Sequence, residues 1–200
     1  MKDGLFAIRY GVSLAGALLL LSVGPSNAVA HDGHSQTGPQ RPLTPEQQVQ
    51  ANALVQIVKE STRQYQDIAV ALAAGYVPRF GCVTGSSEGA MGLHLVHDPL
   101  VADPAIDATK PELLVYEPKP GGKFDLVAAD YLVVADAWHD TNVAPPELVG
   151  QLFHLFEEPN RFTLPAFYTL HVWAWKDNSQ GTFANWNPDV SCDAYDGQTP

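Results

Sequence analysis

One long helical pattern, followed by a series of short strand patterns, is the feature that most constrains the fold. Apolar residues recur at helical spacing through Thr44–Ala74, where Thr44 opens a capping box and Gly75 ends the pattern. A helix followed by neighbouring strands predicts an α+β fold, in which one long N-terminal amphipathic helix packs on a small, mainly antiparallel sheet. The strand patterns lie at Ala90–Val96, Leu113–Glu117, Asp125–Val134 and Phe167–Trp175, with a further candidate at Gly150–His154.

The start of the chain has the features of an export signal. Lys2 and Arg9 flank the beginning of a short apolar run, and Ala28-Val29-Ala30 fits a cleavage site. The apolar run is shorter than the roughly 20 residues that span a bilayer, so we expect no membrane span. The sequence therefore predicts a secreted or periplasmic protein. The expected parts are a signal peptide over 1–30, a disordered tail over 31–43 and a single α+β domain over 44–200.

The charge balance limits the partners. The chain carries a formal net charge of −11, which argues against nucleic acid and anionic membranes, because both bind basic surfaces. The expected partners are a metal ion and a small-molecule ligand, although an acidic surface is more commonly only solvated. His31 and His34 of the tail are candidate copper ligands, with a solvated tail as the alternative.

Two cysteines in an exported chain predict one disulfide, Cys82–Cys192. This bond would close a loop of about 110 residues, worth roughly 4 to 5 kcal/mol in the chain-entropy description. It would also hold the C-terminal segment beside Gly81–Gly92. Thiolate ligation of a metal by the same two cysteines is the alternative, and an oxidising compartment disfavours it.

Three histidines lie in strand-like, apolar surroundings. His171 shares a strand face with large rings, and such shielding favours the neutral imidazole that binds metals. His94 lies on a face cleared by Gly92 and other small residues, which leaves room for a ligand. His154 follows Phe153 in a similar aromatic setting. The alternative is that each is a core histidine hydrogen-bonded to a neighbour.

Two carboxylates stand in otherwise apolar strand rows, Glu117 and Asp130. A buried carboxylate costs several kcal/mol unless it is paired or bound to a cation. Pairing with Lys123, Arg161 or a backbone amide is the alternative. Three imidazoles and one carboxylate are typical ligands of copper or zinc, and less so of iron. The predicted metal ligands are His94, Glu117, His154 and His171.

Two other functions compete with metal binding. In the first, Trp173, Trp175 and Asp130 line an aromatic pocket for a ligand without a metal, although such rings are more often core. In the second, Gly85-Ser86-Ser87-Glu88-Gly89 is the nucleophile motif of a serine hydrolase that uses Ser87. That motif needs a strand before it and a helix after it, whereas here a strand pattern follows.

Four motifs together resemble an uncharacterised family of secreted bacterial proteins. They are G-A-M-G-x-H, Y-E-P, G-Q-x-F-H and L-H-x-W-x-W-x-x-N-x-x-G-x-F-x-x-W-N-P-x-V-x-C, within about Tyr65 to Cys192. The resemblance implies export and draws attention to His94, Glu117, His154 and His171, but it implies no reaction. His97-Asp98 departs from the family pattern, which has Asn near the strand end.

Overall fold

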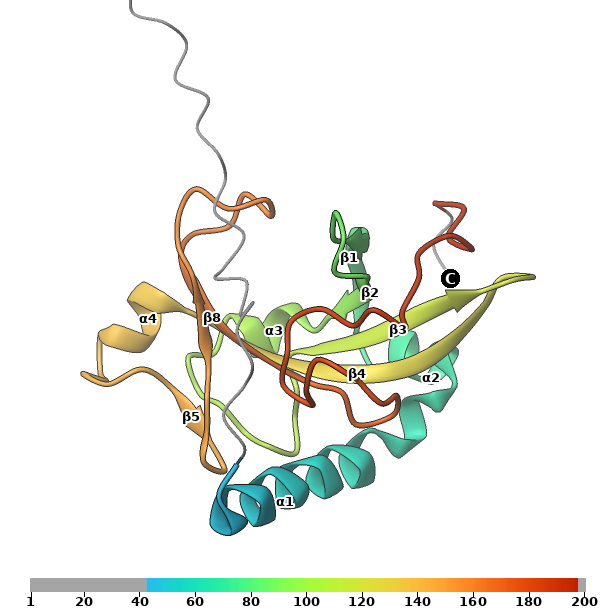
Figure 1. Ribbon diagram of the computed structural model, residues 1–200. Coiled ribbons are helices and arrows are strands. Elements are labelled where there is room, and N and C mark those ends of the chain that lie inside the picture. Colours follow the sequence, from blue (N-terminus) through green and yellow to red (C-terminus); the bar gives the residue numbers. More distant parts are fainter. Residues whose placement is uncertain (1–42, 198–200) are drawn as a thin grey trace, which may run out of the picture.

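The computed structural model describes residues 43–197, in which a helical segment is followed by a mainly antiparallel sheet (Figure 1). This arrangement agrees with the predicted α+β class. The expected signal peptide and almost all of the expected tail, including His31 and His34, lie outside the described residues. Within these residues, no helix is long and apolar enough to cross a membrane.

The predicted helix is present but interrupted. Helix α1 (Pro45–Thr62) begins with the expected capping box, in which Thr44 and Gln47 exchange side chain–backbone hydrogen bonds of 3.2 and 2.9 Å. A 3₁₀ turn, η1 (Arg63–Gln66), and a short helix, α2 (Ile68–Ala73), follow. Asp67 between them is extended, and its side chain caps α2 at the amide of Ala69. Aspartate competes with the helical backbone in this way, which explains the break in the single predicted helix.

Six strands form the main sheet, in the order β1-β2-β3-β4-β8-β7, and each neighbouring pair is antiparallel. The four predicted strands are present, and the β3–β4 hairpin turns where the sequence placed it. The further candidate at Gly150–His154 is divided between two strands of different sheets, β6 and β7. The strands are β1 (Val77–Thr84), β2 (Ala90–Val96), β3 (Leu113–Lys119), β4 (Lys123–Val134), β7 (His154–Phe156) and β8 (Phe167–Val172). The remaining elements are the β5–β6 pair (Glu147–Leu148 and Gln151–Leu152) and two short helices, α3 (Asp98–Val101) and α4 (Ala135–His139).

Two local details of the sheet differ from the sequence prediction. Strand β1 was not predicted, because Phe80 and Gly81 have positive φ angles and the register shifts between Arg79 and Cys82. Such a bulge interrupts the alternation by which a strand is recognised. Strand β8 ends at Val172 rather than at Trp175, because the chain turns away and the amide of Trp173 bonds the carbonyl of Thr182.

Both faces of the sheet are covered. Helices α1 and α2 pack along one face, as Figure 1 shows, against buried residues such as Leu95, Leu114, Tyr131 and Leu170. The other face is covered by two segments. One precedes β8, and the other is the C-terminal segment that follows β8. Their side chains complete two further clusters there, with contributions from Phe162, Leu164, Trp173, Trp186 and Val190. This second face carries the candidate site.

The predicted disulfide Cys82–Cys192 is present and holds the C-terminal segment beside the β1–β2 hairpin. Asn187 exchanges two backbone hydrogen bonds of 3.1 Å with Ala90, which adds a short bridge to the start of β2. Gly89 has a φ of +89°, and a Cβ there would collide with the carbonyl oxygen of Asn187. The expected proximity of these two segments is therefore confirmed.

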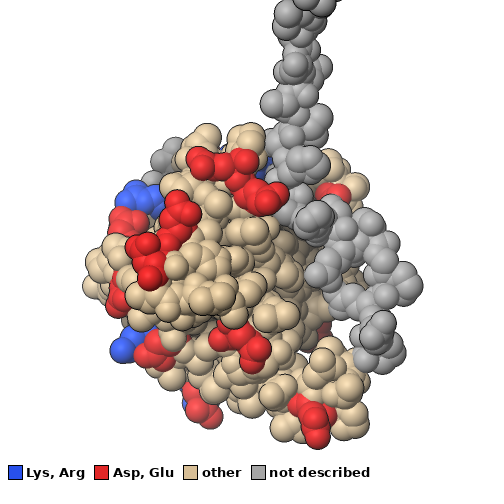
Figure 2. All heavy atoms as spheres, turned by 90° about the vertical axis from the view of Figure 1, so that its left-hand side faces the viewer, with Lys and Arg blue, Asp and Glu red and all other residues tan. Residues whose placement is uncertain are grey.

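Charge on the surface agrees with the composition. Figure 2 shows acidic side chains scattered over one face of the molecule, with only a few basic ones among them. That face offers no continuous basic surface of the kind that binds a phosphate backbone.

Candidate metal centre

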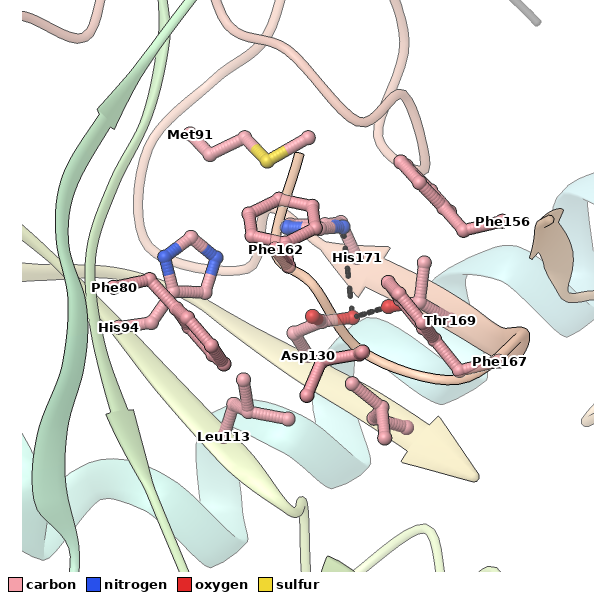
Figure 3. A pocket seen from close by; sticks show the side chains of 12 residues that line it. Phe80, Met91, His94, Leu113, Asp130, Phe156, Phe162, Phe167, Thr169 and His171 are labelled. Atoms are coloured by element: carbon pink, nitrogen blue, oxygen red, sulfur yellow. Dashed lines mark hydrogen bonds and ion pairs between the residues drawn. The ribbon is translucent and has the colours of Figure 1, made fainter. Parts of the chain in front are cut away.

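Three side chains from separate strands meet on the sheet face opposite the helices: His94 of β2, Asp130 of β4 and His171 of β8. Asp130 and His171 are direct cross-strand partners. Each of the three offers one ligand atom, and these atoms all lie within 4.8 Å of one another. Their exposed fractions are 4%, 3% and 2%, so the group is shielded from water. Figure 3 shows the three side chains pointing toward one another.

His94 is held in one tautomer by its own strand. Its Nδ1 lies 3.1 Å from the carbonyl oxygen of Gly92, which can only accept, so Nδ1 carries the proton and Nε2 presents a lone pair. Gly92 has a φ of +110°, and a Cβ there would lie 2.7 Å from the carbonyl oxygen of Tyr116. A glycine is therefore required at this point in β2. Metal-binding histidines commonly donate their second nitrogen to a backbone carbonyl in this way.

His171 has polar atoms that its protein neighbours leave unsatisfied. Both ring nitrogens are buried without a hydrogen-bond partner, and Nδ1 lies 3.5 Å from Oδ1 of Asp130. The ring stacks on Trp173 with 6.2 Å between centroids and meets the ring of His94 edge-on. An unsatisfied buried polar group costs about 1 to 3 kcal/mol. A bound ion would satisfy one of these nitrogens.

Burial sets the charges in the group. It lowers the pKa of His94 to about 4 and that of His171 to about 3, so both rings are neutral at neutral pH. Burial raises the pKa of Asp130 to about 6, although Thr169 donates a hydrogen bond of 2.5 Å to its Oδ1. At neutral pH the group therefore holds one carboxylate and two neutral imidazoles. This combination favours a cation.

The site opens onto a mainly apolar cavity of about 20 Å³, the room of about one water molecule. Thr169 and the three candidate ligands are its polar members. Among the described residues, those that line the cavity include no lysine or arginine that would neutralise Asp130. The apolar members are Phe80, Met91, Leu113, Leu132, Phe156, Phe162, Leu164 and Phe167.

Glu117 lies in a different environment from the one we predicted. It is 5% exposed and accepts hydrogen bonds from Nζ of Lys119 at 2.6 Å, Nζ of Lys176 at 2.8 Å and the amide of Ser191 at 3.2 Å. Glu117 is therefore paired with protein groups, which was the alternative to metal binding. Its partners are Lys119, Lys176 and a backbone amide, and not Lys123 or Arg161. The candidate ligand group of His94, Asp130 and His171 does not include Glu117.

His154 lies next to the candidate group. It pairs with Thr169 across β7 and β8, and it contributes to the lowered pKa of His171. Its Nδ1 lies 2.9 Å from the side-chain oxygen of Asn185, so the ring is already hydrogen-bonded. The structure thus brings together two of the four predicted ligands, His94 and His171. Asp130, which we predicted for the ligand pocket, supplies the carboxylate of the group.

The tryptophans of the predicted pocket lie apart. Trp173 packs on His171, and its Nε1 donates to the carbonyl of Ala184 at 2.6 Å. Trp175 donates to Oγ1 of Thr62 on the helix side of the sheet. The rings that line the cavity are four phenylalanines instead. Two of them, Phe80 and Phe162, lie where the sequence showed no regular pattern, so alternation could not have found them.

Ser87 does not occupy a nucleophile position. It is exposed in the loop that joins β1 to β2, and its amide bonds the carboxylate of Glu88. A strand follows the motif, where the hydrolase motif requires a helix. The geometry therefore gives the serine hydrolase alternative no support.

Comparisons of the chain with protein-family models, with curated proteins and with solved structures gave no match. The resemblance to a secreted bacterial family stays a prediction.

Proposed function

We propose that the protein binds one divalent transition metal ion through His94, Asp130 and His171. The observation that carries this proposal is the buried imidazole of His171, whose two nitrogens lack hydrogen-bond partners beside a buried carboxylate. Bulk solvent does not reach these groups, because the residue is 2% exposed. An ion would bond one nitrogen and neutralise Asp130 at the same time.

Two imidazole nitrogens and one carboxylate oxygen suit zinc, copper and ferrous iron. Copper and zinc are our first candidates, and iron is the next. Bond lengths of about 2.0 to 2.2 Å require small side-chain rotations that bring the ligand atoms closer together. Three protein ligands leave at least one coordination position open, which is the arrangement of catalytic rather than structural sites. A metal at such a position activates a bound water or polarises a substrate oxygen.

We also propose that the protein works outside the cytoplasm. The signal-like start of the sequence and the Cys82–Cys192 disulfide support this, because disulfides persist in oxidising compartments. The resemblance to a secreted family points in the same direction.

Elemental analysis by mass spectrometry tests the proposal. The untagged protein, purified without chelators and then exposed to each metal and desalted, should hold about one copper, zinc or iron ion per chain. His171→Leu should hold less than about a tenth of that amount, because one of three ligands is gone. His139→Leu is the matched control, since His139 bonds Tyr168 and the carbonyl of Asn142 outside the group. Full occupancy in the His171 variant would contradict the proposal.

A further inference from the structure

The ligand group has a charge that its surroundings leave uncompensated once an ion is bound. Metal ligands bind in their deprotonated forms, so a divalent ion with Asp130 and two neutral imidazoles carries a net charge of +1. Asp130 is the one carboxylate among the described residues that line the cavity. A charge in an apolar, water-poor space is costly unless an opposite charge accompanies it. The missing partner is one negative charge at an open coordination position.

The cavity wall favours an apolar body behind that negative charge. Eight of its lining side chains are apolar, and the polar ones gather around the ligand group. Figure 3 shows the rings of Phe80 and Phe162 beside the two histidines, with Phe156 and Phe167 on the side of Thr169. A ligand here has its donor atom at the ion and hydrocarbon against the phenylalanines.

We propose that the open positions of the metal take a small apolar monocarboxylate, whose carboxylate binds the ion while its hydrocarbon body contacts the phenylalanines. This inference rests on the proposed function, since the charge of the site comes from the ion. It adds the chemical class of the ligand. A neutral molecule leaves the +1 charge unpaired, and a dicarboxylate brings a second negative charge into an apolar space.

Phe80 and Phe162 line both the inner cavity and an outer pocket, so such a ligand would enter where these two rings now meet. Their rings meet edge-on with 5.4 Å between centroids, and the outer pocket has a volume of about 210 Å³. A cavity of about 150 Å³ holds benzene, so the outer pocket has room for a body of that size. Arg161 also lines the outer pocket, where its guanidinium donates a hydrogen bond to the carbonyl of Thr84 and lies over the ring of Trp186.

Phe80 is the side chain best placed to move aside. It is 44% exposed, and its φ of +65° is in the left-handed region, which is unfavourable for a bulky residue. It belongs to the bulge in the edge strand β1, and bulges are common beside active sites. The inner cavity has room for little more than the donor end of a ligand. The body of the ligand therefore occupies the space that the two rings now close.

The test uses the full chain loaded with Co²⁺, whose visible absorption reports changes in coordination. Benzoate is titrated first, followed by acetate, which lacks the ring, and benzamide, which lacks the charge. We expect benzoate to shift the Co²⁺ bands and to bind at least about tenfold more tightly than either comparison compound, given the apolar area of one ring. Metal-free protein should bind benzoate at least about tenfold more weakly, because Asp130 then repels it.

The outcomes separate this inference from the metal proposal. Protein that takes up none of Co²⁺, copper, zinc and iron overturns the proposed function and this inference with it. Stoichiometric Co²⁺ with benzoate no tighter than acetate, or no tighter than benzamide, overturns the ligand class alone. Equal benzoate affinity with and without metal places the ligand away from the ion and also overturns the inference.

A pair of variants tests the proposed wall. Phe162→Ala removes a ring from the cavity and should weaken benzoate binding about fivefold to tenfold, with acetate affinity nearly unchanged. Phe124→Ala is the matched control, because Phe124 packs on the helix-side cluster of the sheet. Equal losses of benzoate affinity in the two variants would overturn the proposal that the benzoate ring contacts the phenylalanines of the cavity.

Discussion

Two carboxylates on neighbouring strands show how much the surroundings decide. Glu117 and Asp130 are 5% and 3% exposed, and the sequence placed both in apolar rows. Burial pushes the pKa of Glu117 up, but hydrogen bonds from Lys119, Lys176 and the Ser191 amide outweigh it, and the pKa lies below its ordinary value. Burial raises the pKa of Asp130 to about 6, because hydrogen bonds from the Thr169 hydroxyl and the Leu170 backbone do not outweigh it and, among the described residues, no lysine or arginine lines its cavity.

Glu117 has a structural role, whereas Asp130 is a metal ligand in the proposed function. Glu117 joins the end of β3 to Lys176, which follows β8, and to Ser191 beside the disulfide. Its negative charge is compensated by protein groups. The charge of Asp130 is not, which is the condition under which a buried carboxylate binds a cation. The predictions that follow test this contrast.

The largest expected effect concerns metal affinity. Asp130→Asn should weaken metal binding at least about 100-fold, since even residues that only support a metal ligand cost about 10- to 100-fold. Glu117→Gln should retain affinity within about threefold of the wild type. Competition with a chelator of known affinity measures both. Comparable losses in the two variants would show that both carboxylates serve the metal.

The same substitutions should have opposite effects on the stability of the metal-free protein. Glu117→Gln leaves two lysines without their shared partner and should lower the free energy of unfolding by about 1 to 3 kcal/mol. Asp130→Asn removes an uncompensated buried charge and should raise it by about 1 to 2 kcal/mol at pH 7.5. Urea titrations of both variants provide the measurement. A loss of stability in Asp130→Asn would show that the buried charge of Asp130 is compensated in the metal-free protein, as that of Glu117 is.

A third buried carboxylate, Glu112, sharpens the comparison through pH. Burial raises its pKa to about 8 from an ordinary value of 4.5, although its carboxylate accepts a hydrogen bond from the amide of Leu132. Between these two pH values the folded protein holds a proton that the unfolded chain has released, so its contribution to stability falls as pH rises. This loss amounts to about 1.4 kcal/mol per pH unit at most.

Glu112→Gln should abolish that loss, because the amide keeps an acceptor oxygen and does not titrate. Its stability relative to the wild type should therefore increase between pH 5 and pH 8. Glu60→Gln, at an exposed position of α1, is the control and should show no such trend. Urea titrations at four pH values would decide, and parallel curves for wild type and Glu112→Gln would refute the prediction.

The smallest expected effect concerns the histidine beside the group. His154→Gln should change metal affinity by less than about threefold, because His154 is not among the residues whose ligand atoms lie within 4.8 Å of one another. Chelator competition again provides the measurement. A loss as large as that of His171→Leu would make His154 a ligand, as the sequence first suggested.

Alternation and turn chemistry predicted much of the sheet. Strand β2 and the β3–β4 hairpin follow from apolar alternation and from the turn residues between Lys119 and Lys123. The helix break at Asp67 and the bulge at Phe80 were missed because they depend on side chain–backbone bonding and on positive φ angles. The pattern of apolar residues carries neither kind of information.

The site was predictable only in part, for a related reason. His94 and His171 could be found because each lies on a strand face whose other residues the sequence shows. The choice between Glu117 and Asp130 depends on Lys176, which reaches Glu117 only because the chain turns away after Val172. A residue's partner across the fold is set by tertiary packing, and local spacing does not reveal it.

The candidate ligands lie far apart in the chain and on strands that are not all neighbours. Asp130 and His171 meet only when β8 pairs with β4, and His94 joins them through the intervening strand β3. Pairings between distant segments are among the slower events of folding. The proposed ion would therefore bind to a nearly finished protein rather than guide its assembly. Which metal the proposed site acquires would then depend on the ions available in the compartment where folding ends.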